Sequence, residues 1–177
     1  KHQLTKQLYT YLSTIYSNAN IKMLAIDIDP TLIKRAQEHN IDCNILFTPC
    51  DITTDEGCKL IKEFIKNHNK DMLDIIFCFS VTMWIHINNG DQGLTQVLKF
   101  IKENSRTVII EPQPWKCYKN AQRRMRRSGK SFELYNSLNI RDNIDTVIEN
   151  VISESHVKVY ESPYSSWNRK IQSFLMK

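Results

Sequence analysis

Glycine is scarce in this sequence, with four residues among 177, and no two of them form a G-x-G pair. A nucleotide-binding α/β fold has a glycine-rich turn after its first strand, because the backbone must approach the ligand there. Such a turn is absent, and the chain opens on Lys1 in sequence that is typical of a helix interior. We therefore expect a first strand and its glycine-rich loop upstream of Lys1, so that residues 1–177 form a domain truncated at its amino end.

Other absences exclude whole classes of protein. No apolar run approaches the roughly 20 residues of a membrane-spanning helix, and no secretory signal precedes a cleavage site. The five cysteines have neither C-x-x-C nor zinc-ligand spacing, and they are Cys43, Cys50, Cys58, Cys78 and Cys117. This pattern is typical of reduced thiols in an intracellular protein. We expect a cytoplasmic protein, with the nucleus as a second location, and neither a metal site nor a membrane partner.

Length and composition favour one sizeable domain. Hydrophobic residues make up 41% of the sequence, enough for a real core, and no repeats, low-complexity tracts or linkers divide it. We expect a single monomeric domain over residues 1–177. The net charge of +5 is modest, but much of the excess lies between Lys116 and Lys130, and such clustering is more informative than the total.

Helical and strand-like segments alternate along the chain. Helices are expected near residues 3–17, 31–39, 55–65, 94–104, 116–127 and 144–152, and strands at residues 23–26, 44–47, 72–79, 107–110, 157–160 and 171–175. Asp29 and Pro30 suit the start of the second helix, and Thr54 or Asp55 the start of the third. This order predicts an open, largely parallel α/β sheet with an antiparallel strand near one edge.

Two further expectations concern the middle of the chain. Residues 72–79 (MLDIIFCF) are the most continuous apolar run, which predicts a central strand. Residues 80–93 fit neither the helical nor the strand period, and they include Trp84, His86 and a polar turn. We interpret them as a functional loop.

Residues 108–127 (VIIEPQPWKCYKNAQRRMRR) have the most distinctive pattern in the sequence. A buried strand is followed by Pro112 and Pro114, which cannot continue a ladder, so the chain must turn there. The next segment is dense in lysine and arginine and ends at Ser128-Gly129. A strand end that presents an acid, an amide and an indole beside a basic helix indicates a pocket for an anionic ligand.

Ligands of open α/β sheets bind beyond the carboxyl ends of the strands. Asp27 follows one predicted strand, and its carboxylate can accept hydrogen bonds from both hydroxyls of a ribose. Asp51 follows the next strand, where it can accept from an adenine amino group, with Ile28 and Ile52 as apolar walls. The alternatives are that Asp27 and Asp29 cap the following helix, which is the favoured interpretation for Asp29, and that Asp51 is a solvated loop carboxylate.

Three segments resemble a known family. They are residues 24–30 (LAIDIDP), residues 80–94 (SVTMWIHINNGDQGL) and residues 111–118 (EPQPWKCY). The last two are long and specific, and together the segments resemble the bicoid-interacting-protein-three family of S-adenosylmethionine-dependent RNA 5′-phosphate methyltransferases. Trp-Lys-Cys-Tyr and the late Ser166-Trp167-x-Arg169 are more similar to the RNA 5′-monophosphate branch than to the methylphosphate capping branch. The resemblance runs from Lys1 to the carboxyl terminus and departs from the family at the missing glycine-rich loop.

The resemblance implies a Rossmann-like class I methyltransferase fold and a reaction. The cofactor would be S-adenosyl-L-methionine, with S-adenosyl-L-homocysteine as product, and the substrate the 5′-monophosphate of a tRNA or precursor-microRNA type of RNA. Cofactor contacts are expected from Asp27, Ile28, Asp29, Asp51, Ile52 and Ser80. Substrate contacts are expected from Trp84, Trp115, Lys116, Lys119, Arg123 and Arg124, and catalytic contacts from Glu111, Gln113 and His86.

Each of these assignments has a plainer alternative. The basic run can be a solvated helix face, the two tryptophans can be packing residues, and a lone histidine is more often structural than catalytic. Glu111 either lines the cofactor pocket or bonds within its own turn. Two other functions also fit the residues, namely a non-catalytic RNA-binding relative and a small-molecule or protein methyltransferase.

Overall fold

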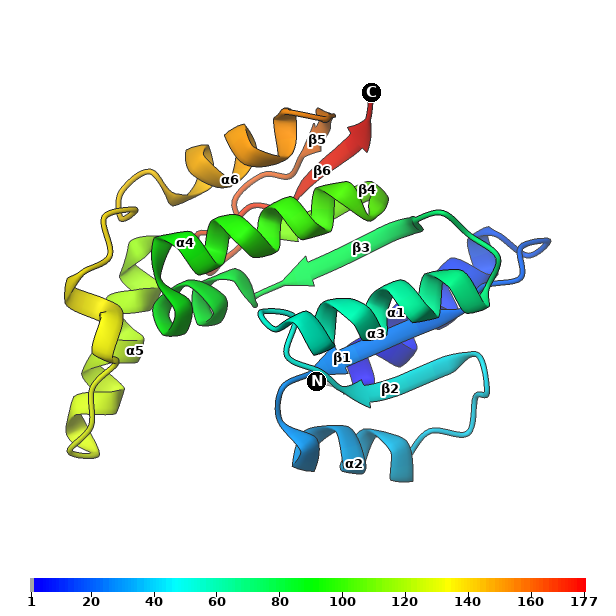
Figure 1. The fold of residues 1–177 in the computed structure, drawn as a ribbon, viewed down its shortest axis with the longest axis horizontal. Helices are drawn as coiled ribbons and strands as arrows, with labels where there is room; N and C mark the ends of the chain where they lie inside the picture. The colour runs from blue at the N-terminus through cyan, green and yellow to red at the C-terminus, as the bar shows by residue number, and fades with distance from the viewer. Residues whose placement is uncertain (1) are drawn as a thin grey trace. The chain divides into compact units, whose positions relative to one another are not determined.

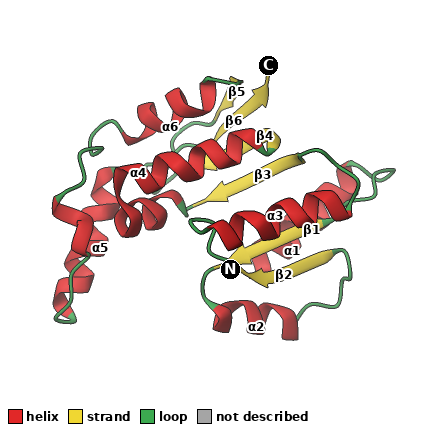
Figure 2. Cartoon of the chain, in the orientation of Figure 1, coloured by secondary structure: helices red, strands yellow, loops and turns green. Residues whose placement is uncertain are grey.

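The computed structural model describes residues 2–177, which divide into two compact units with the boundary between residues 64 and 65. Each unit has its own sheet, with strand order β1-β2 in the first and β3-β4-β6-β5 in the second (Figures 1 and 2). The single domain expected from the sequence stays a prediction. No helix in the described residues combines the length and the apolar character needed to cross a membrane.

The first unit is a small parallel α/β layer. Its elements are α1 (His2–Ile15), β1 (Met23–Asp27), α2 (Pro30–Glu38), β2 (Ile45–Pro49) and most of α3 (Asp55–Asn67). The core is formed by apolar side chains of α2 and β2, with one aromatic residue from α1 and two residues of β1 packed against it: Ile33, Ala36, Ile45, Phe47, Tyr9, Met23 and Ala25. Every predicted element of this unit is confirmed to within a few residues.

Local chemistry sets both helix starts that follow the strands. Asp29 accepts a hydrogen bond from the Thr31 backbone nitrogen at 2.8 Å, and Pro30 is the first residue of α2, as predicted. The Thr54 hydroxyl accepts from the Gly57 nitrogen at 3.1 Å at the start of α3. A Cβ on Gly57 would lie only 1.9 Å from the Asp51 carbonyl oxygen, so glycine allows this turn to close tightly behind β2.

The second unit contains the larger sheet. Its elements are β3 (Leu73–Phe79), α4 (Thr82–Glu103), β4 (Ser105–Glu111), α5 (Trp115–Arg127), the 3-10 helix η1 (Glu133–Asn136), α6 (Ile144–Ser153), β5 (His156–Glu161) and β6 (Gln172–Met176). β3 and β4 are parallel, and β6 runs antiparallel to both β4 and β5. The predicted antiparallel strand near one edge is therefore confirmed. Helices α4 and α6 pack together and cover β4 and β5 (Figure 1), and Val108, Ile148 and Phe174 are fully buried between them.

Two expectations about the middle of the chain are wrong. β3 is an edge strand of its sheet rather than a central one, because β4 is its only partner in the described chain. Most of its side chains are accordingly only partly buried despite their apolar character. Burial of a strand depends on which segments pair with it, and an apolar run by itself does not predict that pairing.

The predicted loop at residues 80–93 is helical. Thr82 begins α4, and the helix is kinked at Gly90, whose φ of 72° is outside the helical region. The side-chain amides of Asn88 and Asn89 donate to the carbonyls of Trp84 and Ile85 and close the first helical segment. The kink changes which positions face inward, and this explains why no single helical period fits residues 80–93.

The basic helix forms as predicted. α5 begins at Trp115 directly after Pro114 and ends at Arg127. Ser128 is the C-cap, and Gly129 then takes a positive φ of 73°. Its buried face contains Trp115, Tyr118, Ala121 and Gln122, while the basic side chains lie on the opposite face.

The five cysteines are free thiols, as expected, and burial raises the pKa of Cys78 to about 12.

Candidate functional site

In the first unit, the acidic residues lie at adjacent strand ends. Asp27 is the last residue of β1 and is paired in register with Pro49 of β2, and the Cys50 nitrogen donates to the Asp27 carbonyl at 3.0 Å. One carboxylate oxygen of Asp27 accepts from the Asp29 nitrogen at 3.0 Å. Asp29 is the helix cap, which was the favoured interpretation for that residue. Asp27 therefore shapes the turn after β1 and does not cap α2.

Asp51 is fixed in the turn that follows β2. One of its carboxylate oxygens accepts from the Thr53 nitrogen at 2.9 Å and from the Thr53 hydroxyl at 2.7 Å. Ile28 is 68% exposed beside Asp27, and Ile52 is partly exposed. Two carboxylates and an exposed isoleucine at neighbouring strand ends match the polar and apolar parts of an adenosine, so the residues present fit the cofactor predicted from the sequence.

In the second unit, Ser80, Glu111 and Arg169 meet at the ends of β3 and β4. Ser80 has a φ of 56° and its hydroxyl donates to a Glu111 carboxylate oxygen. A nitrogen of the Arg169 guanidinium donates to the Ser80 hydroxyl at 2.7 Å and lies 3.5 Å from the same Glu111 oxygen. The second terminal nitrogen approaches the Cys117 sulfur at 3.7 Å. A half-buried carboxylate is thus held by an arginine from a distant segment.

Arg169 is a site residue that the sequence did not single out. The only signal was its place in the Ser166-Trp167-x-Arg169 motif, which carried part of the family resemblance. It is 58 residues from Glu111 and 89 residues from Ser80 along the chain. No periodicity or spacing rule relates residues so far apart.

Gln113 is a buried cap for α4. Its side-chain oxygen accepts from the Thr82 hydroxyl and from the Met83 nitrogen, both at 3.1 Å, and the residue is 2% exposed. The first turn of a helix has backbone nitrogens without helical partners, and Gln113 satisfies one of them. The Gln113 side chain therefore connects the turn after β4 to the first turn of α4.

His86 is fully buried, and both of its ring nitrogens have partners. Its Nε2 lies 2.7 Å from a carboxylate oxygen of Asp91, and its Nδ1 lies 3.0 Å from the Tyr118 hydroxyl. Burial lowers the pKa of His86, although Asp91 opposes this shift. The neutral tautomer that matches these partners donates from Nε2 to Asp91 and accepts from the Tyr118 hydroxyl at Nδ1.

Asp91 extends this network to the segment after η1. Burial raises the pKa of Asp91, but hydrogen bonds from His86, Asn139 and Ile140 together lower it below its usual value. The backbone and side-chain nitrogens of Asn139 donate to one carboxylate oxygen at 2.9 and 3.1 Å. His86 and Asp91 thus attach this segment to α4, in the arrangement of a structural histidine.

The two tryptophans differ in their surroundings. Trp115 is 9% exposed, its ring stacks on Tyr135 at 5.2 Å, and the Arg141 guanidinium lies 5.2 Å from its centre. Trp84 is 41% exposed, and the nearest aromatic ring is that of Phe132 at 6.2 Å. Trp115 is therefore packed in the interior, whereas Trp84 has surface that a ligand can reach.

The four basic residues predicted to contact the substrate lie on the open face of α5. Lys116, Lys119, Arg123 and Arg124 are all exposed. None of them forms an ion pair with a described residue, in contrast to Arg169. No cluster of three or more potential metal ligands occurs between residues 2 and 177. The second unit therefore offers positive charge, without internal neutralisation, just past the carboxyl end of β4.

Comparisons with known proteins agree with these features. The sequence profile described as bicoid-interacting protein 3 (Bin3) matches residues 73–176, which lie within the second unit. The RNA 5′-monophosphate methyltransferase of Mus musculus is 34% identical over 91% of this chain, and the chain spans 58% of the length of that relative. The pre-miRNA 5′-monophosphate methyltransferase of Xenopus laevis is 35% identical over 97% of this chain and 70% of its own length.

The fold is also found among solved structures. The N-methyltransferase NodS from Bradyrhizobium japonicum WM9, in complex with S-adenosyl-L-homocysteine, is similar with a TM-score of 0.53 at 11% identity, over 97% of this chain and 86% of that one. The Rossmann-like class I methyltransferase fold predicted from the sequence is confirmed. With a profile match over most of the second unit and relatives of the predicted branch at 34–35% identity, the chain belongs to the bicoid-interacting protein 3 family.

Proposed function

We propose that the protein transfers a methyl group from S-adenosylmethionine to the 5′-terminal monophosphate of a small RNA. The observation that carries this proposal is the unneutralised basic face of α5, which begins directly after the turn at the carboxyl end of β4. Ligands of this fold class bind at that end of the strands. The names of the relatives, RNA and pre-miRNA 5′-monophosphate methyltransferase, support the choice of substrate.

A terminal RNA phosphate needs little chemical activation. Its second pKa is about 6 by analogy with phosphoserine, so the attacking oxygen already carries negative charge at neutral pH. S-adenosylmethionine, when bound, supplies an electrophilic methyl group on a positively charged sulfur. The phosphate oxygen would accept this methyl group, and S-adenosylhomocysteine would be left as the product.

The protein contributes position and charge. The lysines and arginines of α5 would seat the phosphate by charge and orient its oxygen for attack. In the first unit, Asp27 and Asp51 would hold the ribose and the adenine of the cofactor. Gln113 and His86 act as positioning residues, because Gln113 fixes the start of α4 and His86 attaches the segment after η1.

Glu111 has a separate part in this arrangement. Arg169 and Ser80 both contact it, so its carboxylate keeps a fixed orientation at the end of β4. The charge of Arg169 also compensates that of Glu111, which would otherwise repel a phosphate placed beside it. Ser80 thereby belongs to the substrate side of the site as well as to the predicted cofactor contacts.

The direct test is methyl transfer in the protein of natural length. Labelled S-adenosylmethionine is supplied with one short RNA in three forms, carrying a 5′-monophosphate, a 5′-hydroxyl or a 5′-triphosphate. We expect label only in the monophosphate RNA, and treatment with phosphatase before the reaction should prevent it. Equal labelling of the hydroxyl form would overturn the proposal.

The same assay separates the rival functions. A small-molecule or protein methyltransferase would keep its activity when Lys116, Lys119, Arg123 and Arg124 are all changed to glutamine, whereas an RNA 5′-phosphate enzyme would lose it. A non-catalytic RNA-binding protein would bind the monophosphate RNA and transfer no methyl group. We also propose that the protein is cytoplasmic, because its five free thiols suit a reducing compartment, and that it is a monomer.

A further inference from the structure

The second unit has an aromatic surface beside its basic helix, formed by Trp84 and Phe132. Trp84 belongs to α4 and is 41% exposed, and its ring centre lies 6.2 Å from that of Phe132. Phe132 is partly exposed in the segment between α5 and η1. Two neighbouring aromatic rings that both keep open surface are more typical of a contact site than of a core.

The position of Trp84 is the edge of the sheet where ligands bind. Trp84 lies in the first turn of α4, just past the end of β3. β3 and β4 are parallel and in register, with Phe79 paired with Glu111, so α4 and α5 begin at the same edge of the sheet. Ligands of open α/β folds bind at this edge. The open ring of Trp84 is therefore on the side where a substrate would arrive.

Phe132 is held against α5 by hydrogen bonds. The side-chain oxygen of Gln122, a buried residue of α5, accepts from the Phe132 nitrogen at 3.1 Å. The Lys130 nitrogen donates to the Met125 carbonyl at 3.2 Å, so the segment after α5 folds back along the helix. Phe132 is thus already ordered next to α5, and binding through its ring would cost little conformational entropy.

The helix that holds Phe132 is strongly basic. Six of its 13 residues are lysine or arginine, all are exposed, and none forms an ion pair with a described residue. In the segment after the helix, Lys130 and Glu133 cancel each other, so the positive charge comes from α5 itself. Proteins that bind single-stranded nucleic acids combine cations along the backbone with aromatic rings that stack on the bases. The charge therefore favours RNA as the occupant of the aromatic surface.

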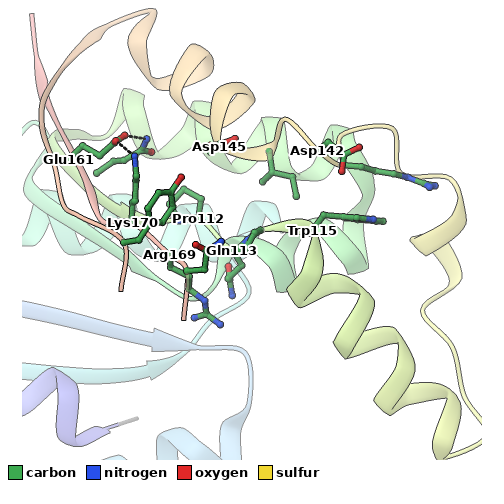
Figure 3. A pocket seen from close by; sticks show the side chains of 14 residues that line it. Pro112, Gln113, Trp115, Asp142, Asp145, Glu161, Arg169 and Lys170 are labelled. Atoms are coloured by element: carbon green, nitrogen blue, oxygen red, sulfur yellow. Dashed lines mark hydrogen bonds and ion pairs between the residues drawn. The ribbon is translucent and has the colours of Figure 1, made fainter. Parts of the chain in front are cut away.

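Trp115, the other tryptophan predicted to contact the substrate, is not open to a base. Its ring is stacked on Tyr135, and the Arg141 guanidinium lies over it. It lines a pocket of about 280 Å³ in the second unit, where Figure 3 shows it at the same end as Asp142. Three cationic and three anionic side chains line this pocket, so it does not attract an RNA backbone: Arg141, Arg169, Lys170, Asp142, Asp145 and Glu161.

We infer that Trp84 and Phe132 bind an unpaired base of the RNA by stacking, while the cations of α5 hold the backbone. Bases inside a duplex are stacked on each other and are closed to side-chain rings. The inference rests on the proposed function, because it assigns the aromatic surface to the same RNA, and it adds a substrate class. This class is RNA that leaves at least one base unpaired where it contacts α5. Phe132 becomes a substrate-binding residue.

The test compares two 5′-monophosphate RNAs, a single strand and a blunt-ended duplex that contains the same strand. Binding to the protein of natural length is measured by fluorescence anisotropy. We expect Trp84→Ala and Phe132→Leu each to weaken binding of the single strand by about tenfold, the loss that one stacked base implies. Binding of the duplex depends on backbone charge alone and should change by less than about twofold.

Conservative variants separate stacking from packing. Leucine in Phe132→Leu keeps an apolar side chain but no ring, whereas Phe132→Tyr and Trp84→Phe keep a ring and should bind the single strand within about threefold of wild type. Tyr160→Ala is the matched control, because it removes a 57% exposed ring from β5, outside the aromatic surface. It should bind both RNAs as wild type does. Melting temperatures report whether each variant is folded.

Tryptophan fluorescence gives a second readout that is independent of affinity. Trp167 is 77% exposed, so Trp167→Phe removes the most exposed of the three tryptophans and leaves Trp84 with the buried Trp115. In this variant, the single-stranded RNA should quench the emission and the duplex should quench it much less. Adding Trp84→Phe should abolish the quenching.

The possible failures point to different conclusions. If Trp84→Ala and Phe132→Leu bind the single strand as wild type does, or weaken both RNAs equally, the aromatic surface does not stack an unpaired base. It would then be a packing surface or a protein contact, and methyl transfer to a monophosphate RNA would leave the proposed function intact. If the single strand binds through both rings but no methyl group is transferred, the stacking site stands and the proposed activity falls. A wild-type protein that bound neither RNA would overturn both.

Discussion

The side-chain oxygen of Gln113 lies 3.1 Å from the backbone nitrogen of Met83 and so joins the turn after β4 to the first turn of α4. Both residues are buried, and their separation is 30 positions in the sequence. Gln113, which was predicted to make a catalytic contact, therefore stabilises the start of α4. The consequences for stability and for activity can be separated by experiment.

Gln113→Ala should lower the free energy of unfolding by about 1–3 kcal/mol, because it leaves the Met83 nitrogen and the Thr82 hydroxyl without their acceptor. Urea unfolding of the protein of natural length measures this change. Gln96→Ala, at an exposed position of α4, is the control and should change stability by less than about 0.5 kcal/mol. If Gln113→Ala were as stable as wild type but inactive, the side chain would be catalytic rather than structural.

The His86–Asp91 pair should make stability depend on pH. The pKa of each is lowered in the folded protein, so the unfolded chain binds protons more readily and stability falls as the pH falls. For His86 the loss begins near pH 6.5, the ordinary value for histidine, and continues towards its lowered folded value. For Asp91 it begins only below about pH 4.

Melting temperatures between pH 7.5 and pH 5 measure the His86 contribution. His86→Gln should be less stable than wild type at pH 7.5, with a smaller decrease in melting temperature on acidification. His68→Gln is the comparison, since His68 is exposed near the end of α3. A variant without His86 that lost as much stability as wild type between these pH values would show that another group titrates.

The Asp27 carboxylate should be required for tight cofactor binding. S-adenosylhomocysteine at 100 times its dissociation constant stabilises the native protein by about 2.7 kcal/mol, which corresponds to about 5 °C or more in melting temperature for a protein of this size. Asp27→Asn should abolish most of this shift, because the amide cannot accept from two ribose hydroxyls as a carboxylate does. Asp55→Asn, at an exposed position in the first turn of α3, is the control and should keep the full shift. A full shift in Asp27→Asn would remove Asp27 from the site.

Arg123→Ala should weaken RNA binding mainly at low salt. Each lost phosphate contact reduces the slope of log K against log salt by about 0.7 for a single strand, so the variant should approach wild type as the salt concentration rises. Lys66→Ala removes an exposed charge from the last turn of α3 and should leave the slope unchanged. Binding curves of Arg123→Ala that overlay wild type across the titration would assign α5 to an ordinary solvated surface.

Arg169→Lys should impair activity more than folding. Lysine keeps the charge but cannot contact Ser80, Glu111 and Cys117 together, and a hydrogen bond to a charged group contributes about 1.5–3 kcal/mol. We expect kcat/KM for the monophosphate RNA to fall by about tenfold or more. Arg106→Lys, at an exposed position of β4, should retain wild-type values. An active Arg169→Lys protein would show that charge alone is needed there.

The sequence by itself determined the features that depend on neighbouring residues. The starts of α2 and α5 follow from Asp29-Pro30 and from the two prolines before Trp115, because caps and proline geometry act within a few residues. The strand positions and the basic face of α5 follow from periodicity in the same way. The long EPQPWKCY motif, with residues 24–30 and 80–94, carries the family resemblance in the sequence alone.

Only the tertiary structure decided which side chains are free to act. Trp115 and His86 are residue types that are common in binding sites. In the structure, however, the Trp115 ring is stacked on Tyr135, and His86 is hydrogen-bonded to Asp91. Arg169 reaches Ser80 across 89 residues, a contact that depends on how strands β3, β4 and β6 are ordered. Strand order and burial arise from the packing of the whole chain, so neither can be predicted from the local sequence pattern.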